Sequence, residues 1–164
     1  MIKKYPRLVD LFKVFFLLTI VYAIFIFYLS SQSDVASDFG FLKKQYIREF
    51  LAIFEILELD IVDKLSSIIY SNYDKILHFG LYVGFGALLY LTMYYSHSSF
   101  LRKYAAVFAF IIGVLYAISD EIIHQSFVSG RVVSILDLVA DITGIALAVV
   151  VMSMIFMIRG FMKH

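Results

Sequence analysis

The sequence contains no cysteine, no tryptophan and a single proline among its 164 residues. Without cysteine the chain forms no disulfide, offers no thiolate to a metal and has no thiol nucleophile. Without tryptophan, the twelve tyrosines are left as the aromatic residues suited to a membrane–water interface. There is also no internal repeat, low-complexity stretch or Gly/Pro linker. We therefore expect one domain that comprises residues 1–164.

Charged residues are scarce as well. They make up 16% of the chain, whereas hydrophobic residues make up 62%, and the mean hydropathy is +0.90. An ordinary soluble domain has roughly half apolar and about a quarter charged residues. The excess of apolar surface has to face something other than water, and lipid is the obvious candidate.

Four long apolar stretches each approach the roughly 20 residues that a helix needs to cross a hydrocarbon core about 30 Å thick. Open strands cannot satisfy their backbone hydrogen bonds in lipid, so the stretches are predicted to be helices. We expect spans at about 12–30, 75–95, 104–123 and 135–158. The predicted fold class is an all-α membrane protein with four transmembrane helices in a small bundle. The first span follows a basic segment but lacks a small-residue cleavage site, which indicates a retained anchor.

A further helical pattern occupies the connection between the first two spans. Apolar residues recur at helical spacing from Ile47 to Ile69, and charged residues fall mostly between them. Beside a membrane, this pattern predicts an outer amphipathic helical loop at about 39–70 that lies in the headgroup plane. A helix packed over the mouth of the bundle is an alternative, and the two arrangements are compatible.

Positive charge is distributed unevenly between the two ends of the four-span arrangement. The end with both termini carries eight basic residues and one acid, Asp10, and the opposite end carries the other twelve acids and six basic residues. The positive-inside rule then places both termini in the cytoplasm of a cell-membrane protein. The connections at 30–75 and 121–134 are predicted to face outward.

Polar residues gather where three of the spans approach the outer face. The second span opens with Asp74, Lys75, His78 and Tyr82, and positions 74, 78 and 82 share one helical face. The third span closes with Ser119, Asp120, Glu121, His124 and Gln125, followed by Gly130 and Arg131, and the fourth span adds Asp137 and Asp141 on one face. The inner halves of the spans are almost purely apolar, so any chemistry is expected at this outer end.

These residues can transfer protons and hold anions. Carboxylates and imidazoles serve general acid–base catalysis, and the catalytic candidates are Asp74, His78, Asp120, Glu121, His124 and Asp141. Cationic and hydrogen-bonding side chains hold anionic groups, and the substrate-binding candidates are Lys75, Tyr82, Gln125, Arg131 and Asp137.

Most of these candidates also have a plainer structural interpretation. Asp74 and Asp137 fit capping boxes with Ser71 and Ser134. Lys75 and Arg131 can bind lipid headgroups, and a single histidine is more often structural than catalytic.

Asp141 is the hardest of the candidates to explain as a capping residue. It lies about two turns inside the fourth helix, where a carboxylate costs on the order of 2.5–3.5 kcal/mol on insertion scales. It therefore needs a partner or a wet cavity, and Arg131, Lys75 and His78 are available at that depth. An acid inside a membrane is a functional candidate by default, with a structural ion pair as the alternative.

Glu121 and His124 also form a Glu-x-x-His pair, a spacing found in carboxylate-bridged metal sites of helical bundles. Such sites use the pair twice, and this sequence contains one copy. Together with His78, Asp120 and Asp141, the pair would form an oxygen and nitrogen site for a hard or borderline cation. A divalent metal is therefore the minority hypothesis, and the sequence requires no cofactor.

The polar residues form a series of motifs. They are Ser30-Ser31-Gln32-Ser33, then Asp74-Lys75-x-x-His78-Phe79-x-x-Tyr82, then Ser119-Asp120-Glu121-x-x-His124-Gln125-x-Phe127-x-x-Gly130-Arg131, then Asp137-x-x-x-Asp141-x-x-Gly144. The series resembles the VanZ-like family over nearly the whole chain, although many members have proline where this chain has Ser129. The resemblance implies a small four-helix membrane domain of the Gram-positive cell envelope and, in the namesake, low-level teicoplanin resistance. It implies no reaction.

Three functions fit this pattern. The first is a membrane enzyme that acts on an amphiphile in the outer leaflet, and the second is a non-catalytic protein in which Arg131 and Lys75 hold a headgroup phosphate. The third, a transporter, ranks last because transporter sites usually lie near the bilayer midplane. The expected partners are membrane lipid and a lipid-linked cell-wall precursor, and not nucleic acid.

Overall fold

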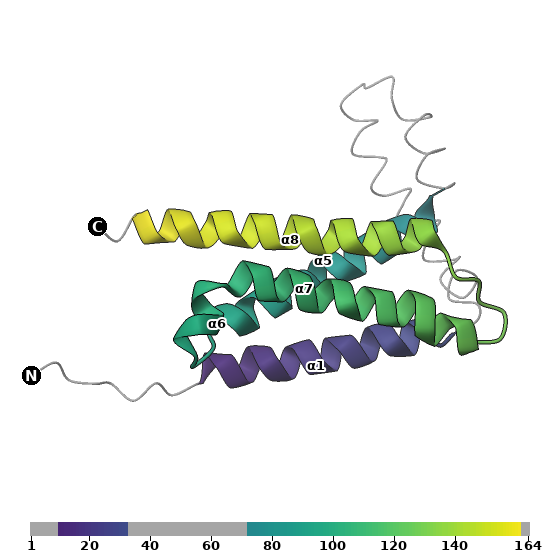
Figure 1. The fold of residues 1–164 in the computed structure, drawn as a ribbon, viewed down its shortest axis with the longest axis horizontal. Helices are drawn as coiled ribbons and strands as arrows, with labels where there is room; N and C mark the ends of the chain where they lie inside the picture. Colours follow the sequence, from purple (N-terminus) through teal and green to yellow (C-terminus); the bar gives the residue numbers. More distant parts are fainter. Residues whose placement is uncertain (1–9, 33–71, 162–164) are drawn as a thin grey trace, which may run out of the picture.

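The computed structural model describes residues 10–32 and 72–161, and these residues form a helical bundle (Figure 1). Its long helices are α1 (Leu11–Ser30), α5 (Tyr73–Tyr94), α7 (Ala105–Ile118) and α8 (Ile135–Phe161). The short helix α6 (Ser99–Lys103) precedes α7, which continues into a π-helix, η1 (Ser119–His124), and a 3-10 turn, η2 (Gln125–Phe127). The described ranges contain no strand. The amphipathic segment expected at 39–70 and the capping residue Ser71 lie outside them.

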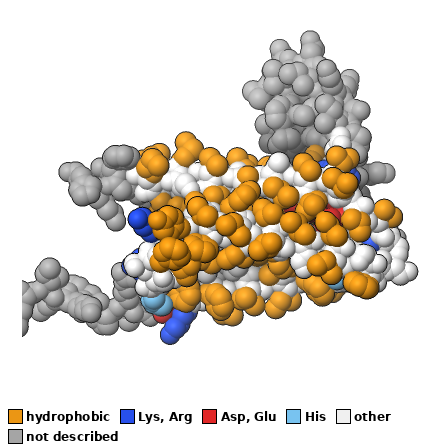
Figure 2. Space-filling model, viewed as in Figure 1, with side chains coloured by type: hydrophobic (Ala, Val, Ile, Leu, Met, Phe, Trp, Pro, Cys, Tyr) orange, Lys and Arg blue, Asp and Glu red, His pale blue; other side chains and the backbone are white. Residues whose placement is uncertain are grey.

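Four helical segments are long and apolar enough to cross a membrane. They are Leu11–Ser30, Tyr73–Tyr94, Ala105–Phe127 and Ile135–Ile158. Hydrophobic side chains cover most of the visible flank of the bundle (Figure 2). The all-α, four-span prediction is confirmed, and the protein is a multi-pass membrane protein. The third span runs a few residues past its predicted end because η1 and η2 continue the helical path.

Helix α5 lies at the centre of the bundle and packs against α1, α7 and α8. Its side chains Tyr82, Phe85 and Leu89 are buried, together with Ile26 of α1 and Ile145 of α8. Small buried residues recur on α7 at every fourth position, namely Ala105, Ala109, Gly113 and Ala117. Such small residues let membrane helices approach closely.

Helices α5 and α8 approach each other closely at Gly144. A Cβ atom at this position would lie 2.5 Å from the carbonyl oxygen of Phe79 and 3.1 Å from the backbone nitrogen of Val83. Only glycine, which has no side chain, permits this contact. The contact fixes the register of the two helices next to His78 and Asp141.

The two ends of the bundle differ in charge. Both ends of the described chain lie at one of them, which we call the basic end (Figure 1). Lys13, Arg102 and Lys103 lie there with Asp10, whose carboxylate is 3.2 Å from His97 and 3.7 Å from Lys13. The other five acids of the described ranges lie at the opposite end, which we call the site end.

Candidate functional site

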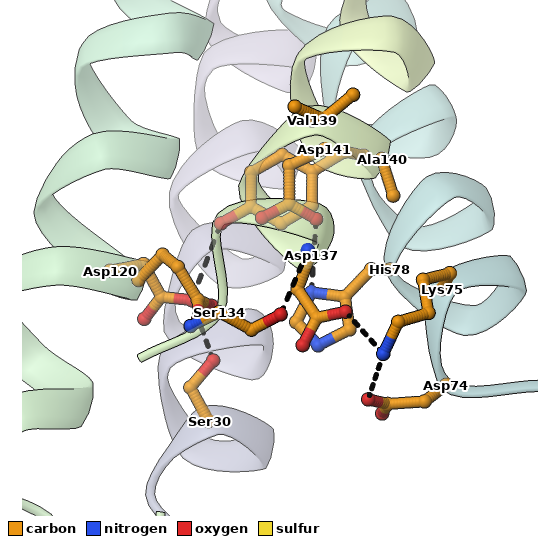
Figure 3. A network of polar contacts seen from close by, with 12 residues as sticks. Ser30, Asp74, Lys75, His78, Asp120, Ser134, Asp137, Val139, Ala140 and Asp141 are labelled. Atoms are coloured by element: carbon orange, nitrogen blue, oxygen red, sulfur yellow. Dashed lines mark hydrogen bonds and ion pairs between the residues drawn. The ribbon is translucent and has the colours of Figure 1, made fainter. Parts of the chain in front are cut away.

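The centre of the site end is a contact between α5 and α8 (Figure 3). His78 Nδ1 lies 3.0 Å from Asp141 Oδ1. Asp141 is completely buried, and its second oxygen, Oδ2, has no hydrogen-bond partner among the described residues. Of the three partners that the sequence offered to Asp141, the structure therefore selects His78.

Lys75 binds two other carboxylates, those of Asp74 and Asp137, near the His78–Asp141 contact (Figure 3). Its Nζ lies 3.0 Å from Asp137 Oδ1 and 3.3 Å from Asp74 Oδ2. The contact with Asp137 is an ion pair. Ser134 Oγ accepts a hydrogen bond from the backbone nitrogen of Asp137, which is one half of the predicted capping box. The other half is not formed, because the backbone nitrogen of Ser134 donates to Glu121, and the carboxylate of Asp137 is instead the partner of Lys75.

Glu121 is buried beside the His78–Asp141 pair. Its Oε1 accepts a hydrogen bond of 2.7 Å from the backbone nitrogen of Ser134, and its Oε2 accepts one from the amide of Gln125. One ligand atom each from His78, Glu121 and Asp141 lies within 4.8 Å of the others. We call these three residues the inner cluster. One ligand atom each from Asp74, His78 and Asp137 also lies within 4.8 Å of the others, so His78 belongs to both groups.

Asp120 points to the other side of the site, toward α1. Its Oδ2 accepts hydrogen bonds from Ser30 Oγ at 2.6 Å and Tyr82 OH at 3.3 Å. Its Oδ1 lies 3.1 Å from His124 Nδ1, and His124 Nε2 lies 3.1 Å from Ser31 Oγ. A hydroxyl, an imidazole and a carboxylate thus stand in line, which is the order found in nucleophile–base–carboxylate catalytic sites. Ser31 Oγ donates its one hydrogen bond to the carbonyl oxygen of Phe27 at 2.7 Å, a common arrangement near a helix end.

Asp120 and Glu121 lie in the π-helix η1 and have different partners. Consecutive residues Asp120 and Glu121 face α1 and the start of α8 respectively, and each contacts the side chain four positions later, His124 or Gln125. Short π-helical segments inside α-helices frequently occur at functional sites. The local structure therefore supports the interpretation of this region as the site.

Arg131 has a different partner from the one considered in the sequence. Its Nε donates to the carbonyl oxygen of Gln32 at 2.8 Å, and its Nη2 donates to that of Leu29 at 3.2 Å. The guanidinium therefore binds two carbonyl groups where α1 ends. Arg131 does not pair with Asp141.

A cavity of about 230 Å³ opens between α1 and α5 at the site end. It is lined by Phe25, Ile26, Leu29, Ser30, Tyr73, Asp74, Leu77, His78, Leu81, Tyr82 and Arg131. The predicted shared face of Asp74, His78 and Tyr82 is confirmed, because all three line this cavity. The remaining candidates are not among its lining residues, namely Lys75, Asp120, Glu121, His124, Gln125, Asp137 and Asp141. The cavity therefore combines apolar walls from α1 and α5 with a polar end.

Sequence reasoning missed the roles of three serines. Ser30 and Ser31 contact Asp120 and His124 across some 90 residues of chain, and the backbone of Ser134 holds Glu121. The only signal for the first two was the serine tract that follows the first span. The distance along the sequence between this tract and the acids of the third span does not predict which side chains are in contact.

The comparisons with known proteins agree with the motif series. A family model described as VanZ/LLP1 matches residues 14–157, which is most of the chain. The comparisons with curated proteins and with solved structures find no match. On the family model, and in agreement with the four spans, this chain belongs to the VanZ/LLP1 family.

Proposed function

We propose that this protein binds a membrane amphiphile in the cavity between α1 and α5 and carries out acid–base chemistry on its headgroup. The observation that carries the proposal is the composition of the cavity. Ser30, Asp74 and Arg131 lie nearest the end of the bundle, whereas Phe25 and Leu81 lie deeper along the same helices. A hydrocarbon chain matches the apolar walls, and a polar headgroup matches the outer end.

The polar end provides groups for binding and for proton transfer. Arg131 is a planar cation suited to phosphate or carboxylate oxygens. His78 is the imidazole that lines the cavity, and Asp141 behind it orients the ring. An imidazole backed by a carboxylate is a common general acid–base arrangement. The proposed chemistry is proton transfer to or from a headgroup atom that lies beside His78.

The charge distribution favours the extracytoplasmic leaflet as the location of the cavity. Because cytoplasmic connections carry an excess of lysine and arginine, the basic end is assigned to the cytoplasm of the cell membrane. The amphiphile is then a lipid or a lipid-linked cell-wall precursor on the outer side. Teicoplanin acts on such a precursor outside the cytoplasm, so we include a contribution to glycopeptide (teicoplanin) resistance in the proposal.

The binding part is tested by filling the cavity. In Leu81→Trp a larger side chain occupies the apolar wall, and the matched control Leu115→Trp places the same ring on the exposed face of α7. Native mass spectrometry of protein purified from bacterial membranes is expected to show a bound amphiphile in the wild type and in the control, and little in Leu81→Trp. Equal occupancy in all three proteins contradicts the proposal.

The chemical part is tested by charge removal that preserves shape. Asp141→Asn and Glu121→Gln are expected to retain the bound amphiphile and to lose both the conversion of lipids in a bacterial extract and the effect on teicoplanin susceptibility. Lipid conversion is measured by mass spectrometry before and after incubation with purified protein. If both variants keep the susceptibility effect, the chemistry is excluded and the protein is a non-catalytic binder of headgroups.

A second form of chemistry is favoured by the line from Ser31 through His124 to Asp120. In this form the Ser31 hydroxyl turns from the carbonyl oxygen of Phe27 to His124, and Ser31 Oγ bonds to the carbonyl carbon of a lipid ester while His124 takes the hydroxyl proton. The proton then passes to the departing alcohol, and water later releases the acyl group. A fluorophosphonate probe is expected to label the wild type and the control Ser126→Ala, but not Ser31→Ala. Unchanged labelling of Ser31→Ala rules this form out.

A further inference from the structure

The carboxylates at the site end are unequally neutralised. Asp120, Glu121, Asp137 and Asp141 are all buried, with exposed fractions of 3%, 1%, 7% and 0%. A buried carboxylate is costly unless it is paired and hydrogen-bonded. Asp137 has the ammonium group of Lys75, and Asp120 has two hydroxyl groups and the imidazole of His124. Arg131 is engaged with carbonyl groups of α1.

The inner cluster lacks a matching positive charge. The hydrogen-bond donors to Glu121 are a neutral amide and a backbone nitrogen, which bring no net charge. Asp141 has the imidazole of His78 on one oxygen, and its other oxygen is buried without a hydrogen-bond partner in the described part of the chain. Two carboxylates within 4.8 Å of each other therefore share, at most, the single charge of His78.

We infer that His78, Glu121 and Asp141 bind one divalent metal ion. The three side chains come from α5, η1 and α8, so the packed helices hold them in place. Ligands bound at about 2.0–2.2 Å from one ion lie up to about 4.4 Å apart, so the observed separations need only small side-chain movements. Two oxygen ligands and one nitrogen ligand suit a borderline or hard ion such as Zn²⁺ or Mn²⁺. A bound ion would provide a partner for the unpartnered oxygen of Asp141.

The neighbouring group of Asp74, His78 and Asp137 is not the metal site. Lys75 already brings an ammonium group to both of its carboxylates. Nor does the Glu-x-x-His pair act as a unit, because His124 faces Asp120 and Ser31 rather than the inner cluster. Gln125 and the backbone of Ser134 hold Glu121, as outer partners commonly hold metal ligands.

The ion deepens the proposed function. His78 lines the cavity, so a bound ion would lie beside the headgroup and could polarise an oxygen atom or activate a water molecule. The water would then take over the proton transfer assigned above to His78. This role rests on the proposed function, whereas metal binding itself does not.

The metal content of purified protein tests the inference. Protein purified from cells supplied with Zn²⁺ and Mn²⁺ is expected to contain about one ion per chain by elemental mass spectrometry, in line with a single three-ligand site. Asp141→Asn and Glu121→Gln are expected to bind at least about tenfold more weakly. Asp74→Asn is the matched control, because it removes a carboxylate of the neighbouring group, and its metal content is expected to stay at the wild-type level.

A second measurement separates loss of metal from loss of fold. Wild-type protein stripped with EDTA is expected to gain thermal stability when Zn²⁺ or Mn²⁺ is restored, because a ligand that binds only the folded state stabilises it. Absence of a stoichiometric ion together with no thermal shift overturns the inference. Loss of the ion in Asp74→Asn overturns the choice of cluster. A bound amphiphile in metal-free protein leaves the proposed binding function standing in either case.

Discussion

At the scale of the residue, one missing side chain sets the geometry of the site. Gly144 lies against the backbone of α5, and a Cβ atom there would stand 2.5 Å from the carbonyl oxygen of Phe79. Backbone atoms cannot move aside as a flexible side chain can. Gly144→Ala is therefore expected to push α8 from α5 and to lower the free energy of unfolding by about 1–3 kcal/mol. Thermal unfolding in detergent measures the effect.

Gly80 provides the matched control for this substitution. It lies on α5, one residue beyond Phe79, and apart from its chain neighbours and the backbone of its own helix, no described atom lies within 4 Å of the position a Cβ would take. Gly80→Ala is expected to be neutral or to stabilise by about 0.4–1 kcal/mol, because alanine reduces the freedom of the unfolded chain. Equal melting temperatures for the two variants would show that the α5–α8 contact at Gly144 does not limit packing.

The residue scale also shows what the sequence could predict of the site. The spacing of Asp74, His78 and Tyr82 predicts a shared face because it depends on one helix alone, and the cavity confirms it. The choice of His78 rather than Arg131 as partner of Asp141 depends on how α5 and α8 are rotated against each other. That rotation is fixed by close contacts such as the one at Gly144, which hydropathy and spacing do not reveal.

At the scale of the element, the π-helix η1 is the feature that helical spacing did not predict. Apolar content alone set the lengths of the four spans to within a few residues, because the thickness of the membrane fixes them. The register inside a span is a finer property. Ile122 and Ile123 are consecutive apolar residues, and both are exposed in the structure. The apolar pattern of the sequence therefore gave no sign that the helical pitch changes here.

A deletion within η1 tests whether this element contains one residue more than an α-helix over the same length. A π-helix closes its hydrogen bonds one residue later than an α-helix, so removal of Ile123 is expected to restore α-helical spacing. Because the deletion also moves His124 and Gln125 from the positions at which they contact the buried Asp120 and Glu121, we expect it to lower the free energy of unfolding by about 1–3 kcal/mol and to leave expression intact. Size-exclusion profiles and melting temperatures in detergent provide the measurement.

A deletion in the middle of α7 is the control for η1. Removal of Ile112 rotates Ala105 and Ala109 by about 100° relative to Gly113 and Ala117. Larger side chains then enter the interface where small residues now pack. This protein is expected to express poorly or to aggregate. If the two deletions are equally damaging, η1 is an integral part of the packing rather than a one-residue insertion.

At the scale of the whole molecule, charge and chemistry are separated along the bundle axis. The described acids other than Asp10 lie at the site end, and the basic end carries Lys13, Arg102 and Lys103. Because an even number of spans brings both termini to one side, a single orientation decides where the cavity faces. The proposal of an outer-leaflet amphiphile depends on that orientation.

The absence of native cysteine allows the orientation to be measured without background. Ser129 is exposed in the turn before α8 at the site end, and Ser99 is exposed in α6 at the basic end. In intact cells, a membrane-impermeant maleimide is expected to label Ser129→Cys at once. Ser99→Cys is expected to react only after the membrane is permeabilised, because the positive-inside rule assigns the basic end to the cytoplasm. The reverse pattern would place the cavity in the inner leaflet, where neither an extracytoplasmic wall precursor nor teicoplanin could reach it.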